Sequence, residues 1–530
     1  MIELRNVTFT YPNGTAPALR DVHCVVEEGE FVLLVGPSGA GKSTLLRTLN
    51  GLVPHFSGGR IAGRVSVAGH DPVAEGPHGM SSVVGFVQQD PEAQFVVDTV
   101  EDELAFGMEN QRLPQPLMRK RVEEVLDQLA IAHLRQRRIT SLSAGEKQRV
   151  AIGAVLTLQP KVLVLDEPTS QLDPQSAEEV LTALRHLNQD LGLTIVLSEH
   201  RLERVIQYAD RMIYLPQAGA QPCIGTPEEV LQGMPFAPPL IRLAQAYHWQ
   251  PMPLAIRDAR RFVGQMRLTP ATLPTRPSAG EVCIEARDVW YDYDGLEALA
   301  GLHLQARRGE LIALMGRNGS GKTTLLKHLV GLLQPTRGRV VVDGLDTSHS
   351  SVEDLIRHVG YVPQDPSSML FADTVRQELE FTRRAHGLLP ADLEPWLAEL
   401  GLQGLSERYP RELSVGQRQR VALAAILVGE PSILLLDEPT RGVDPAEKQL
   451  LARFLQAQAA QGRTVILASH DVELVAECCQ RVVIMGEGQV VVDGPAREVM
   501  SQSLTFASQV TKLFRDPRLL TVQDVLEAQR

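Results

Sequence analysis

Runs of consecutive apolar residues alternate with polar, glycine-rich or charged segments along the chain, in the same order in both halves. Apolar runs cover residues 31–35 and 162–165 in the first half, and 311–315 and 433–436 in the second. Unbroken apolar runs of this length are typical of central parallel strands that are buried on both faces. Segments with a helical period lie between them, so the pattern predicts an α/β chain with mostly parallel sheets.

The second half of the chain repeats the first. Residues 36–43 are matched by 316–323, and residues 166–169 by 437–440, with only a slow drift in the separation of matched residues. A slow drift indicates two homologous domains whose loops differ in length. We therefore expect a duplicated domain.

The repeat is interrupted by a segment rich in proline and arginine. We expect a first domain over residues 1–234, a partly helical linker over 235–280, a second domain over 281–509 and a C-terminal tail over 510–530. A flexible linker of this length spans roughly 35 to 40 Å, enough to let the two domains meet. Its six arginines could face nucleic acid or lipid headgroups, but their wide spacing favours a solvated or partner-docking face.

Composition narrows the possible classes of function. The chain is 44% hydrophobic and 22% charged, as ordinary globular domains are, and its formal net charge of −12 argues against a mainly nucleic-acid-binding surface. No apolar run is long enough for a membrane span and the first residues lack a signal-peptide pattern, which predicts a soluble, cytosolic protein. Five scattered cysteines show no metal-ligand spacing.

Two glycine-rich segments carry the clearest chemistry. Residues 36–43 (GPSGAGKS) and 316–323 (GRNGSGKT) fit the phosphate-loop pattern G-x-x-x-x-G-K-[ST] between a predicted strand and a predicted helix. Glycines let successive backbone N–H groups form an anion-binding nest at a helix N-terminus. Lys42 would reach the β- and γ-phosphates of ATP, and Ser43 would ligate Mg²⁺. A chance match would not recur in register, so two ATP sites are predicted.

Pairs of acids end two of the apolar runs, Asp166-Glu167 and Asp437-Glu438. The carboxyl ends of parallel strands are where α/β sheets bind ligands. The aspartates are predicted to hold Mg²⁺ through its waters, and the glutamates to polarise the attacking water. A purely structural role is disfavoured because an unpaired buried charge is costly.

Three further pairs recur in register with the phosphate loops: Gln89 and Gln364, His200 and His470, and Tyr11 and Tyr293. The glutamines are predicted to sense the γ-phosphate and Mg²⁺, the histidines to contact the γ-phosphate, and the tyrosines to stack on adenine. Taken singly, each would more often be a solvated loop residue, a structural hydrogen-bonding histidine or a packing aromatic. Their recurrence favours the functional interpretation.

The segments 142–146 (LSAGE) and 413–417 (LSVGQ) precede predicted helices. A serine hydroxyl with glycine-exposed N–H groups at a helix N-terminus can bind phosphate. The same residues can also serve as an N-cap without further function. Two such helix ends in addition to two phosphate loops suggest that each nucleotide is held between the two halves.

The order of these segments, found twice, resembles the ATP-binding cassette (ABC) ATPases over nearly the whole chain. The resemblance implies two tandem P-loop NTPase domains, each with a mostly parallel central sheet, an antiparallel β subdomain and a helical subdomain, and with Walker A, Q-loop, signature, Walker B, D-loop and switch-histidine segments. Both signatures depart from the family pattern, since Ala144 and Val415 replace a glycine and Glu146 replaces a glutamine. Head-to-tail pairing, as in the family, would place Lys42 with Ser414.

By the same pairing Lys322 would share a nucleotide with Ser143, and both sites are expected to hydrolyse ATP. The catalytic candidates are Glu167, Glu438, His200 and His470. The Mg²⁺ candidates are Ser43, Gln89, Asp166, Thr323, Gln364 and Asp437. The nucleotide-binding candidates are Tyr11, Gly36, Pro37, Ser38, Gly39, Ala40, Gly41, Lys42, Ser43, Thr44, Gln89, Ser143, Gly145, Glu146, Tyr293, Gly316, Arg317, Asn318, Gly319, Ser320, Gly321, Lys322, Thr323, Thr324, Gln364, Ser414, Gly416 and Gln417.

A finer resemblance is to the ATPases of energy-coupling factor importers, carried by residues 89–95 (QDPEAQF), 99–107 (TVEDELAFG) and 198–203 (SEHRLE). It implies a peripheral ATPase pair at the cytoplasmic face of the membrane, with an integral-membrane coupling subunit and a substrate-binding membrane subunit as partners. The cargo would be a vitamin, a vitamin precursor such as thiamine or its pyrimidine precursor, cobalt or nickel. A conventional ABC importer of sugar, peptide or metal, and a soluble ribosome-associated ABC ATPase, remain alternatives.

Overall fold

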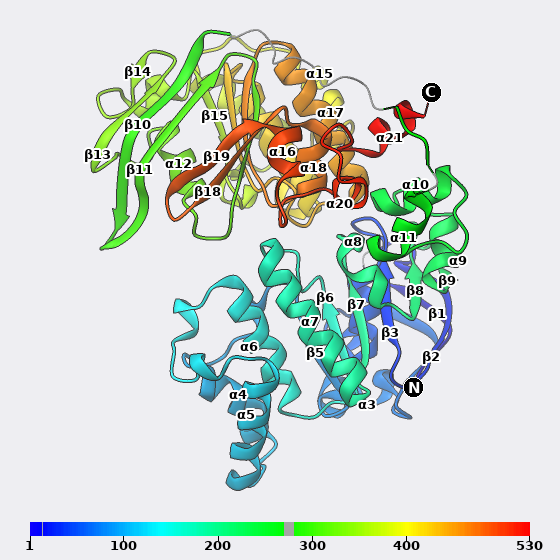
Figure 1. Cartoon of the computed structure of the whole chain (residues 1–530). Coiled ribbons are helices and arrows are strands. Elements are labelled where there is room, and N and C mark those ends of the chain that lie inside the picture. The colour runs from blue at the N-terminus through cyan, green and yellow to red at the C-terminus, as the bar shows by residue number, and fades with distance from the viewer. Residues whose placement is uncertain (13, 265, 270–279, 530) are drawn as a thin grey trace. The chain divides into compact units, whose positions relative to one another are not determined.

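The computed structural model describes residues 1–12, 14–264, 266–269 and 280–529, and it divides into two compact units, Met1–Ile241 and Arg242–Arg530 (Figure 1). Parts of the predicted linker, residues 265 and 270–279, and the last residue of the predicted tail lie outside the described residues. The predicted boundaries at 234, 280 and 509 remain predictions.

The strands of the first unit are β1 (Ile2–Thr10), β2 (Leu19–Val26), β3 (Phe31–Val35), β4 (Arg60–Val67), β5 (Val84–Val87), β6 (Val162–Asp166), β7 (Thr194–Ser198), β8 (Arg211–Tyr214) and β9 (Cys223–Gly225). Those of the second are β10 (Val282–Tyr293), β11 (Leu296–Arg307), β12 (Leu311–Met315), β13 (Arg337–Val342), β14 (Leu345–Asp346), β15 (Val359–Val362), β16 (Ile433–Asp437), β17 (Thr464–Ala468), β18 (Arg481–Gly486) and β19 (Gln489–Pro495).

The α-helices up to the end of the first domain are α1 (Lys42–Leu49), α2 (Leu52–His55), α3 (Pro72–Met80), α4 (Val100–Asn110), α5 (Gln115–Gln128), α6 (Ala144–Leu156), α7 (Pro174–Leu191), α8 (Leu202–Val205) and α9 (Pro227–Gln232). Those that follow are α10 (Pro239–Ala246), α11 (Ile256–Val263), α12 (Lys322–Leu329), α13 (Val352–Leu355), α14 (Val375–Ala385), α15 (Glu394–Glu399), α16 (Val415–Leu427), α17 (Pro445–Ala460), α18 (Val472–Cys478), α19 (Ala496–Ser501), α20 (Gln509–Phe514) and α21 (Val522–Ala528).

The central sheet of the first unit has the strand order β5-β6-β7-β3-β8-β9, with all neighbours parallel except β8 and β9. Every residue of β3, β6 and β7 is buried, as the unbroken apolar runs predicted. The carboxyl ends of β3, β6 and β7 therefore lie side by side, and the loops that follow them carry the phosphate loop, the paired acids and the histidine.

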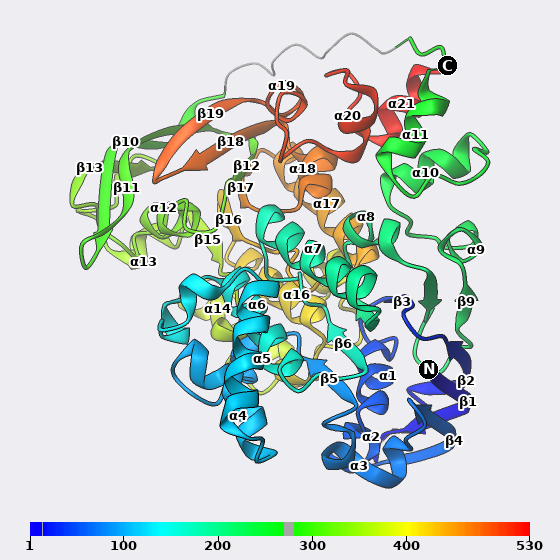
Figure 2. The ribbon, with the colours of Figure 1, turned by 60° about the horizontal axis from the view of Figure 1, so that its bottom comes forward.

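A second, antiparallel sheet of the first unit has the order β2-β1-β4 and packs its apolar face on the central sheet and α1. The helices α4, α5 and α6 contact one another and form a separate helical subdomain. Figure 2 shows this group, coloured cyan, apart from the blue strands β1, β2 and β4. The antiparallel and helical subdomains implied by the resemblance are therefore confirmed.

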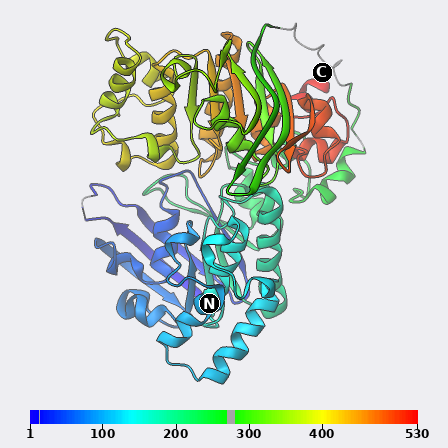
Figure 3. The same cartoon turned by 90° about the vertical axis from the view of Figure 1, so that its left-hand side faces the viewer.

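The second unit repeats this architecture. Its central sheet has the order β15-β16-β17-β12-β18-β19, again with only the last pair antiparallel. Its antiparallel sheet has the order β11-β10-β13-β14, in which β10 and β11 form the long green hairpin of Figure 3. The core of this unit lies on both faces of the central sheet.

The linker helix α11 packs against the tail helix α20 within the second unit, as Figures 1 and 2 both show in green and red. Tyr247 donates a hydrogen bond to Val525 O at 3.3 Å, and the Thr269 N–H donates one to Ala528 O at 2.8 Å. Trp249 is buried and stacks on Phe262, with ring centroids 5.0 Å apart. The described linker residues are therefore tied to the tail, although the sequence predicted a flexible connection.

Within the described ranges, no helix is both long enough and apolar enough to cross a membrane.

Candidate nucleotide-binding and hydrolysis sites

The first phosphate loop joins β3 to α1. Gly36 and Gly41 have φ of 154° and 102°, and a Cβ atom would lie 2.3 Å from Leu215 O at the first and 2.7 Å from Ala18 O at the second. Only glycine fits at both positions, and this keeps the loop close to its neighbours. Lys42, 5% exposed, turns back over the loop and donates to Gly36 O at 3.0 Å and to Pro37 O at 3.2 Å.

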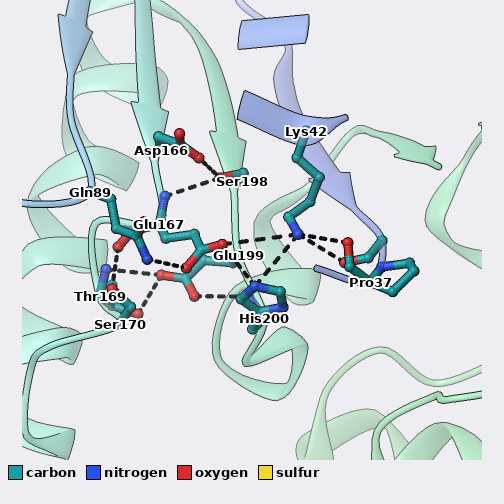
Figure 4. Close-up of polar contacts among 11 residues, drawn as sticks. Pro37, Lys42, Gln89, Asp166, Glu167, Thr169, Ser170, Ser198, Glu199 and His200 are labelled. Atoms are coloured by element: carbon teal, nitrogen blue, oxygen red, sulfur yellow. Dashed lines mark hydrogen bonds and ion pairs between the residues drawn. The ribbon is translucent and has the colours of Figure 1, made fainter. Parts of the chain in front are cut away.

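The predicted catalytic residues of the first half meet beside this lysine (Figure 4). Glu167 Oε1 lies 2.7 Å from His200 Nε2 and 4.0 Å from Lys42 Nζ, while Gln89 Nε2 donates to Glu167 Oε2 at 2.8 Å. Glu167 adopts a left-handed backbone conformation with φ of 49°. The carboxylate is thus held from the phosphate loop, the glutamine loop and the histidine loop at once, where it can accept a proton from water.

A layer of buried polar groups supports this cluster from behind. The Ser198 hydroxyl donates to Asp166 Oδ1 at 2.7 Å and accepts from the Glu167 N–H at 3.0 Å. Glu199 accepts from both the N–H and the hydroxyl of Thr169 through Oε1, and from the His200 N–H through Oε2. Burial raises the pKa of Glu199, and the hydrogen bonds from Thr169 oppose that shift only in part.

The segment that follows Gln89 is fixed at both ends. Buried Glu103 of α4 accepts from the N–H groups of Val96 and Val97, at 2.9 and 3.0 Å. Lys147 Nζ of α6 lies 2.6 Å from Glu92 Oε1, which links the glutamine segment to the signature helix. A displacement of Gln89 would therefore be transmitted to α6.

Ser143 is the N-cap of α6, and its hydroxyl and Glu146 form a reciprocal capping box. Burial alone would raise the pKa of Glu146, but hydrogen bonds from Ser143 lower it below the ordinary value. Ser414 and Gln417 make the same box at the start of α16. The replacement of glutamine by glutamate at 146 thus preserves the local cap geometry.

Gly145 and Gly416 are close to the following helix. An added Cβ would lie 2.7 Å from the Ser176 Cβ at the first and 1.9 Å from a Glu447 carboxylate oxygen at the second. Within each described unit, Ser143 and Ser414 are not among the residues that contact the lysine and glutamate cluster. The structure therefore groups the predicted residues of each half into two separate sets.

The two predicted adenine-stacking tyrosines lie at corresponding places and are 37% and 42% exposed. Tyr11 follows β1, packs edge-on against Phe9, and its hydroxyl lies 2.9 Å from the Thr44 hydroxyl of α1. Tyr293 ends β10 and packs edge-on against Tyr291. Both side chains keep enough exposed surface to stack on a planar ring, and the hydroxyl of Tyr11 contacts the phosphate-loop helix α1.

The second half has the same main residues with different contacts. Lys322 donates to Gly316 O at 2.8 Å and to Arg317 O at 3.0 Å, as Lys42 does in the first loop. His470 Nε2 lies 2.9 Å from Asn318 Oδ1 and 3.1 Å from Glu438 Oε1. The histidine is therefore joined to its own phosphate loop as well as to the glutamate.

The aspartate and the glutamine of the second half also differ in their surroundings. The Tyr361 hydroxyl lies 3.5 Å from Asp437 Oδ2, and Ala468 stands beside Asp437 in the register position that Ser198 has beside Asp166. Burial raises the pKa of Asp437, although a hydrogen bond from Thr323 and the Lys322 charge oppose the shift. Gln364 is exposed, whereas Gln89 is half-buried against Glu167.

Comparison with known proteins identifies the family to which this architecture belongs. The family model described as "ABC transporter" matches residues 19–170 and 299–441, once in each unit. A "Putative ABC transporter ATP-binding protein" of Streptomyces avermitilis is 48% identical over 100% of both chains. This chain belongs to the ABC transporter family. One of its relatives with the same printed name, from Methanosarcina acetivorans, is 39% identical over 99% of this chain and 93% of its own length.

Among solved structures, an archaeal ribosome recycling factor in complex with the ribosomal stalk protein aP1 is 24% identical, with a TM-score of 0.61, over 94% of this chain and 91% of that one. At this identity the likeness concerns the fold alone. This chain is an ATPase with two ABC repeats fused in one polypeptide, as the sequence predicted. ABC ATPases bind ATP, generally with Mg²⁺, and the glycine-cradled lysine and strand-end aspartate of each unit fit that pair.

Several polar residues near the strand-end acids escaped the sequence analysis: Thr169, Ser198, Glu199 and Tyr361. The sequence held one usable signal for them. The residue before each histidine is Glu199 in one repeat and Ser469 in the other, although the flanking strands match closely. A change from an acid to a hydroxyl beside a matched functional residue indicates that the two ABC sites are built differently.

Proposed function

We propose that this chain is the ATP-hydrolysing subunit of a membrane importer of the energy-coupling factor type. The observation that carries the proposal is the presence, in each half of one chain, of a lysine, an aspartate, a glutamate and a histidine gathered at the ends of three parallel strands. Two fused sites of this kind can supply ATP-driven force, and in importers of this type specificity for the cargo lies in other chains. Cargo recognition is therefore assigned to partner subunits.

We assign the roles in the first half by contact and chemistry. Lys42 and the backbone N–H groups of the phosphate loop, which Pro37 lacks, bind the phosphates, and Tyr11 stacks on the adenine. Glu167 accepts a proton from the attacking water, while Gln89 and His200 hold its carboxylate. Ser43 and Asp166 would hold Mg²⁺, which would supply positive charge to offset the charge that develops on the phosphates.

The second half has the same assignment through residues 316–323, Asp437, Glu438 and His470. Gln364 and Tyr293 take the places of Gln89 and Tyr11. We further propose that each ATP is completed by the signature of the other half, so that Ser414 and Gly416 serve the first phosphate loop and Ser143 and Gly145 the second. Dimers of this family are the basis for this part of the proposal.

The segment from Gln89 to Gly107 supports the energy-coupling factor type. Its sequence QDPEAQF followed by TVEDELAFG resembles that group, and Glu103 and the Lys147–Glu92 ion pair give it a defined geometry next to the catalytic glutamate. We propose that an integral-membrane coupling subunit and a substrate-binding membrane subunit are the partners, and that the chain lies at the cytoplasmic face of the membrane. A vitamin, a vitamin precursor, cobalt or nickel is the proposed cargo.

Affinity purification from membranes in mild detergent tests the proposal, with co-purifying chains identified by mass spectrometry and ATPase activity measured with and without them. We expect a small multi-span coupling subunit and a second membrane protein, whose bound ligand names the cargo. Recovery of a permease that depends on a periplasmic binding protein would replace this proposal by a conventional importer. Recovery of ribosomal proteins without membrane chains, with ATPase stimulation by ribosomes, would overturn transport altogether.

The Glu167→Gln, Glu438→Gln double variant is the matched control in that experiment. It should recover the same membrane chains without ATP turnover, because the substitutions leave the surface unchanged and remove both proposed bases.

A further inference from the structure

The two proposed catalytic glutamates, Glu167 and Glu438, differ in whether they accept a hydrogen bond from the backbone N–H of the neighbouring histidine. In the first half the His200 N–H donates to Glu199 Oε2 at 3.1 Å, and Glu167 Oε2 accepts from Gln89 at 2.8 Å. In the second half no acid precedes His470, and the His470 N–H donates to Glu438 Oε2 itself at 3.2 Å. The backbone N–H of His470 thus binds one carboxylate oxygen of Glu438. In the first half the equivalent N–H, that of His200, binds Glu199 instead.

We propose that Glu199 is a positioning residue that holds the His200 backbone and so leaves the Glu167 carboxylate directed toward Gln89. Its counterpart Ser469 lacks this reach, because its hydroxyl accepts from the Asp471 N–H at 3.0 Å. The two ATP sites consequently differ in the placement of the catalytic base. This inference rests on the catalytic roles proposed above for Glu167 and His200.

The contacts of Glu199 with Thr169 strengthen the argument. Glu199 is 2% exposed and Thr169 is fully buried, and both donors of Thr169 point at the same carboxylate oxygen. Glu199 therefore fastens the turn that begins at Glu167 to the strand end that carries His200. Because Glu167 has a left-handed backbone, its side-chain direction depends on how this turn is held.

The corresponding threonine of the second half provides a matched control. Thr440 is 2% exposed, and in the described structure its hydroxyl has no hydrogen-bond partner. Thr169 and Thr440 thus occupy equivalent turns, but only the first is connected to an acid. Replacement of each by valine removes a hydroxyl of the same size at both places.

The experiment compares Glu199→Ser, Glu199→Gln and Thr169→Val in the full chain that also carries Glu438→Gln, so that turnover reports the first site. We expect kcat to fall about tenfold for Glu199→Ser, with KM for ATP unchanged within about twofold, because the base moves while the phosphate loop does not. Glu199→Gln keeps an acceptor for Thr169 but no longer offers a carboxylate to the His200 N–H. Its kcat should therefore lie between that of the parent chain and that of Glu199→Ser. If the Glu438→Gln chain is inactive, turnover is shared and the same variants are compared in the wild-type chain.

Thr440→Val in a chain with Glu167→Gln, or in the wild-type chain if turnover is shared, should keep kcat within about 1.5-fold, whereas Thr169→Val should lose about threefold. The comparison of Thr169→Val with Thr440→Val tests the positioning role of Glu199 even if Glu199→Ser does not fold. Equal effects of the two valine substitutions, or a Glu199→Ser effect confined to KM, would overturn the inference while leaving the proposed function in place. Undiminished turnover in the Glu167→Gln, Glu438→Gln double variant would instead overturn the catalytic roles on which the inference rests.

Discussion

The two halves of the chain carry the same phosphate-loop lysine, strand-end acids and histidine, yet they support these residues with different neighbours. Asp166 accepts a close hydrogen bond from Ser198 at 2.7 Å, whereas Asp437 has Tyr361 at 3.5 Å. The two repeats therefore share the phosphate-loop lysine, the strand-end acids and the histidine, but they differ in the side chains that support these residues. Identical motifs do not guarantee identical sites, because neighbouring side chains decide where a carboxylate points.

The largest expected effect comes from the glutamates themselves. Glu167→Gln and Glu438→Gln, made separately, should each lower ATP turnover, and together they should lower it by about 10²- to 10⁴-fold, because an amide cannot accept the proton. Steady-state ATPase measurements check this, with retained ATP binding as the control for folding. If one substitution left turnover untouched, the expectation that both halves hydrolyse ATP would be wrong.

The second expected effect concerns the described linker residues, which pack within the second unit and have no counterpart in the first. Trp249 is 6% exposed between Tyr247 and Phe262, on linker residues that pack within the second unit. Trp249→Ala should destabilise this packing by about 3 kcal/mol, or roughly 100-fold faster opening in hydrogen exchange of residues 242–264. Exchange of the first unit should not change.

Leu191→Ala, at the exposed end of α7, is the matched control and should leave exchange in both units within about twofold. Fast exchange of residues 242–264 in the unsubstituted chain would contradict the packing between α11 and α20.

Much of this fold could be predicted from the sequence because its signals are local. The apolar runs at 31–35 and 433–436 predicted the buried parallel strands. The glycine spacing of each phosphate loop predicted a strand, a loop and a helix in that order. The candidate residues Lys42, Glu167 and His200 were found because they recur in register. In the structure the side chains of Lys42 and His200 both lie within 4.0 Å of Glu167 Oε1.

The rest depends on tertiary contacts that no local pattern encodes. The linker was predicted to be a flexible spacer because its prolines and arginines suggest one. In the structure Trp249 packs between Tyr247 and Phe262, and the linker helix α11 packs against the tail helix α20. The role of Glu199 also escaped prediction, since an acid after an apolar strand predicts exposure or catalysis. Its three donors come from Thr169 and His200, and their convergence is visible only in three dimensions.

A smaller effect should separate the two aspartates. Ser198→Ala should raise the Mg²⁺ concentration for half-maximal ATPase activity about tenfold, because a group that orients a metal-binding carboxylate typically contributes that much. Tyr361→Phe should shift it about twofold or less, since its hydroxyl lies 3.5 Å from Asp437. Mg²⁺ titrations of the two variants check the order. A larger shift for Tyr361→Phe would mean that the second aspartate depends more on its neighbour than the first.

The smallest expected difference lies at the two signature helices, where one capping box titrates and the other does not. The pKa of Glu146 is lowered in the folded chain, so its stabilising effect is fully present above its unfolded pKa of about 4.3 and is lost as pH falls through the folded value. Gln417 closes the equivalent box with an uncharged amide. Protection of the first turn of α6 should therefore weaken as the pH falls below about 4.3 and through the lowered folded value, while that of α16 stays constant.

Hydrogen exchange of the two helices, corrected for the intrinsic pH dependence of exchange, measures this difference. Glu146→Gln should abolish the acid-dependent loss at α6 and leave the cap within a few tenths, about 0.3 kcal/mol, of its strength at neutral pH. Because the substitution makes the first signature match the second, any pH dependence that persists would have to come from outside the capping box. In that case the two signature helices would differ for reasons other than residue 146.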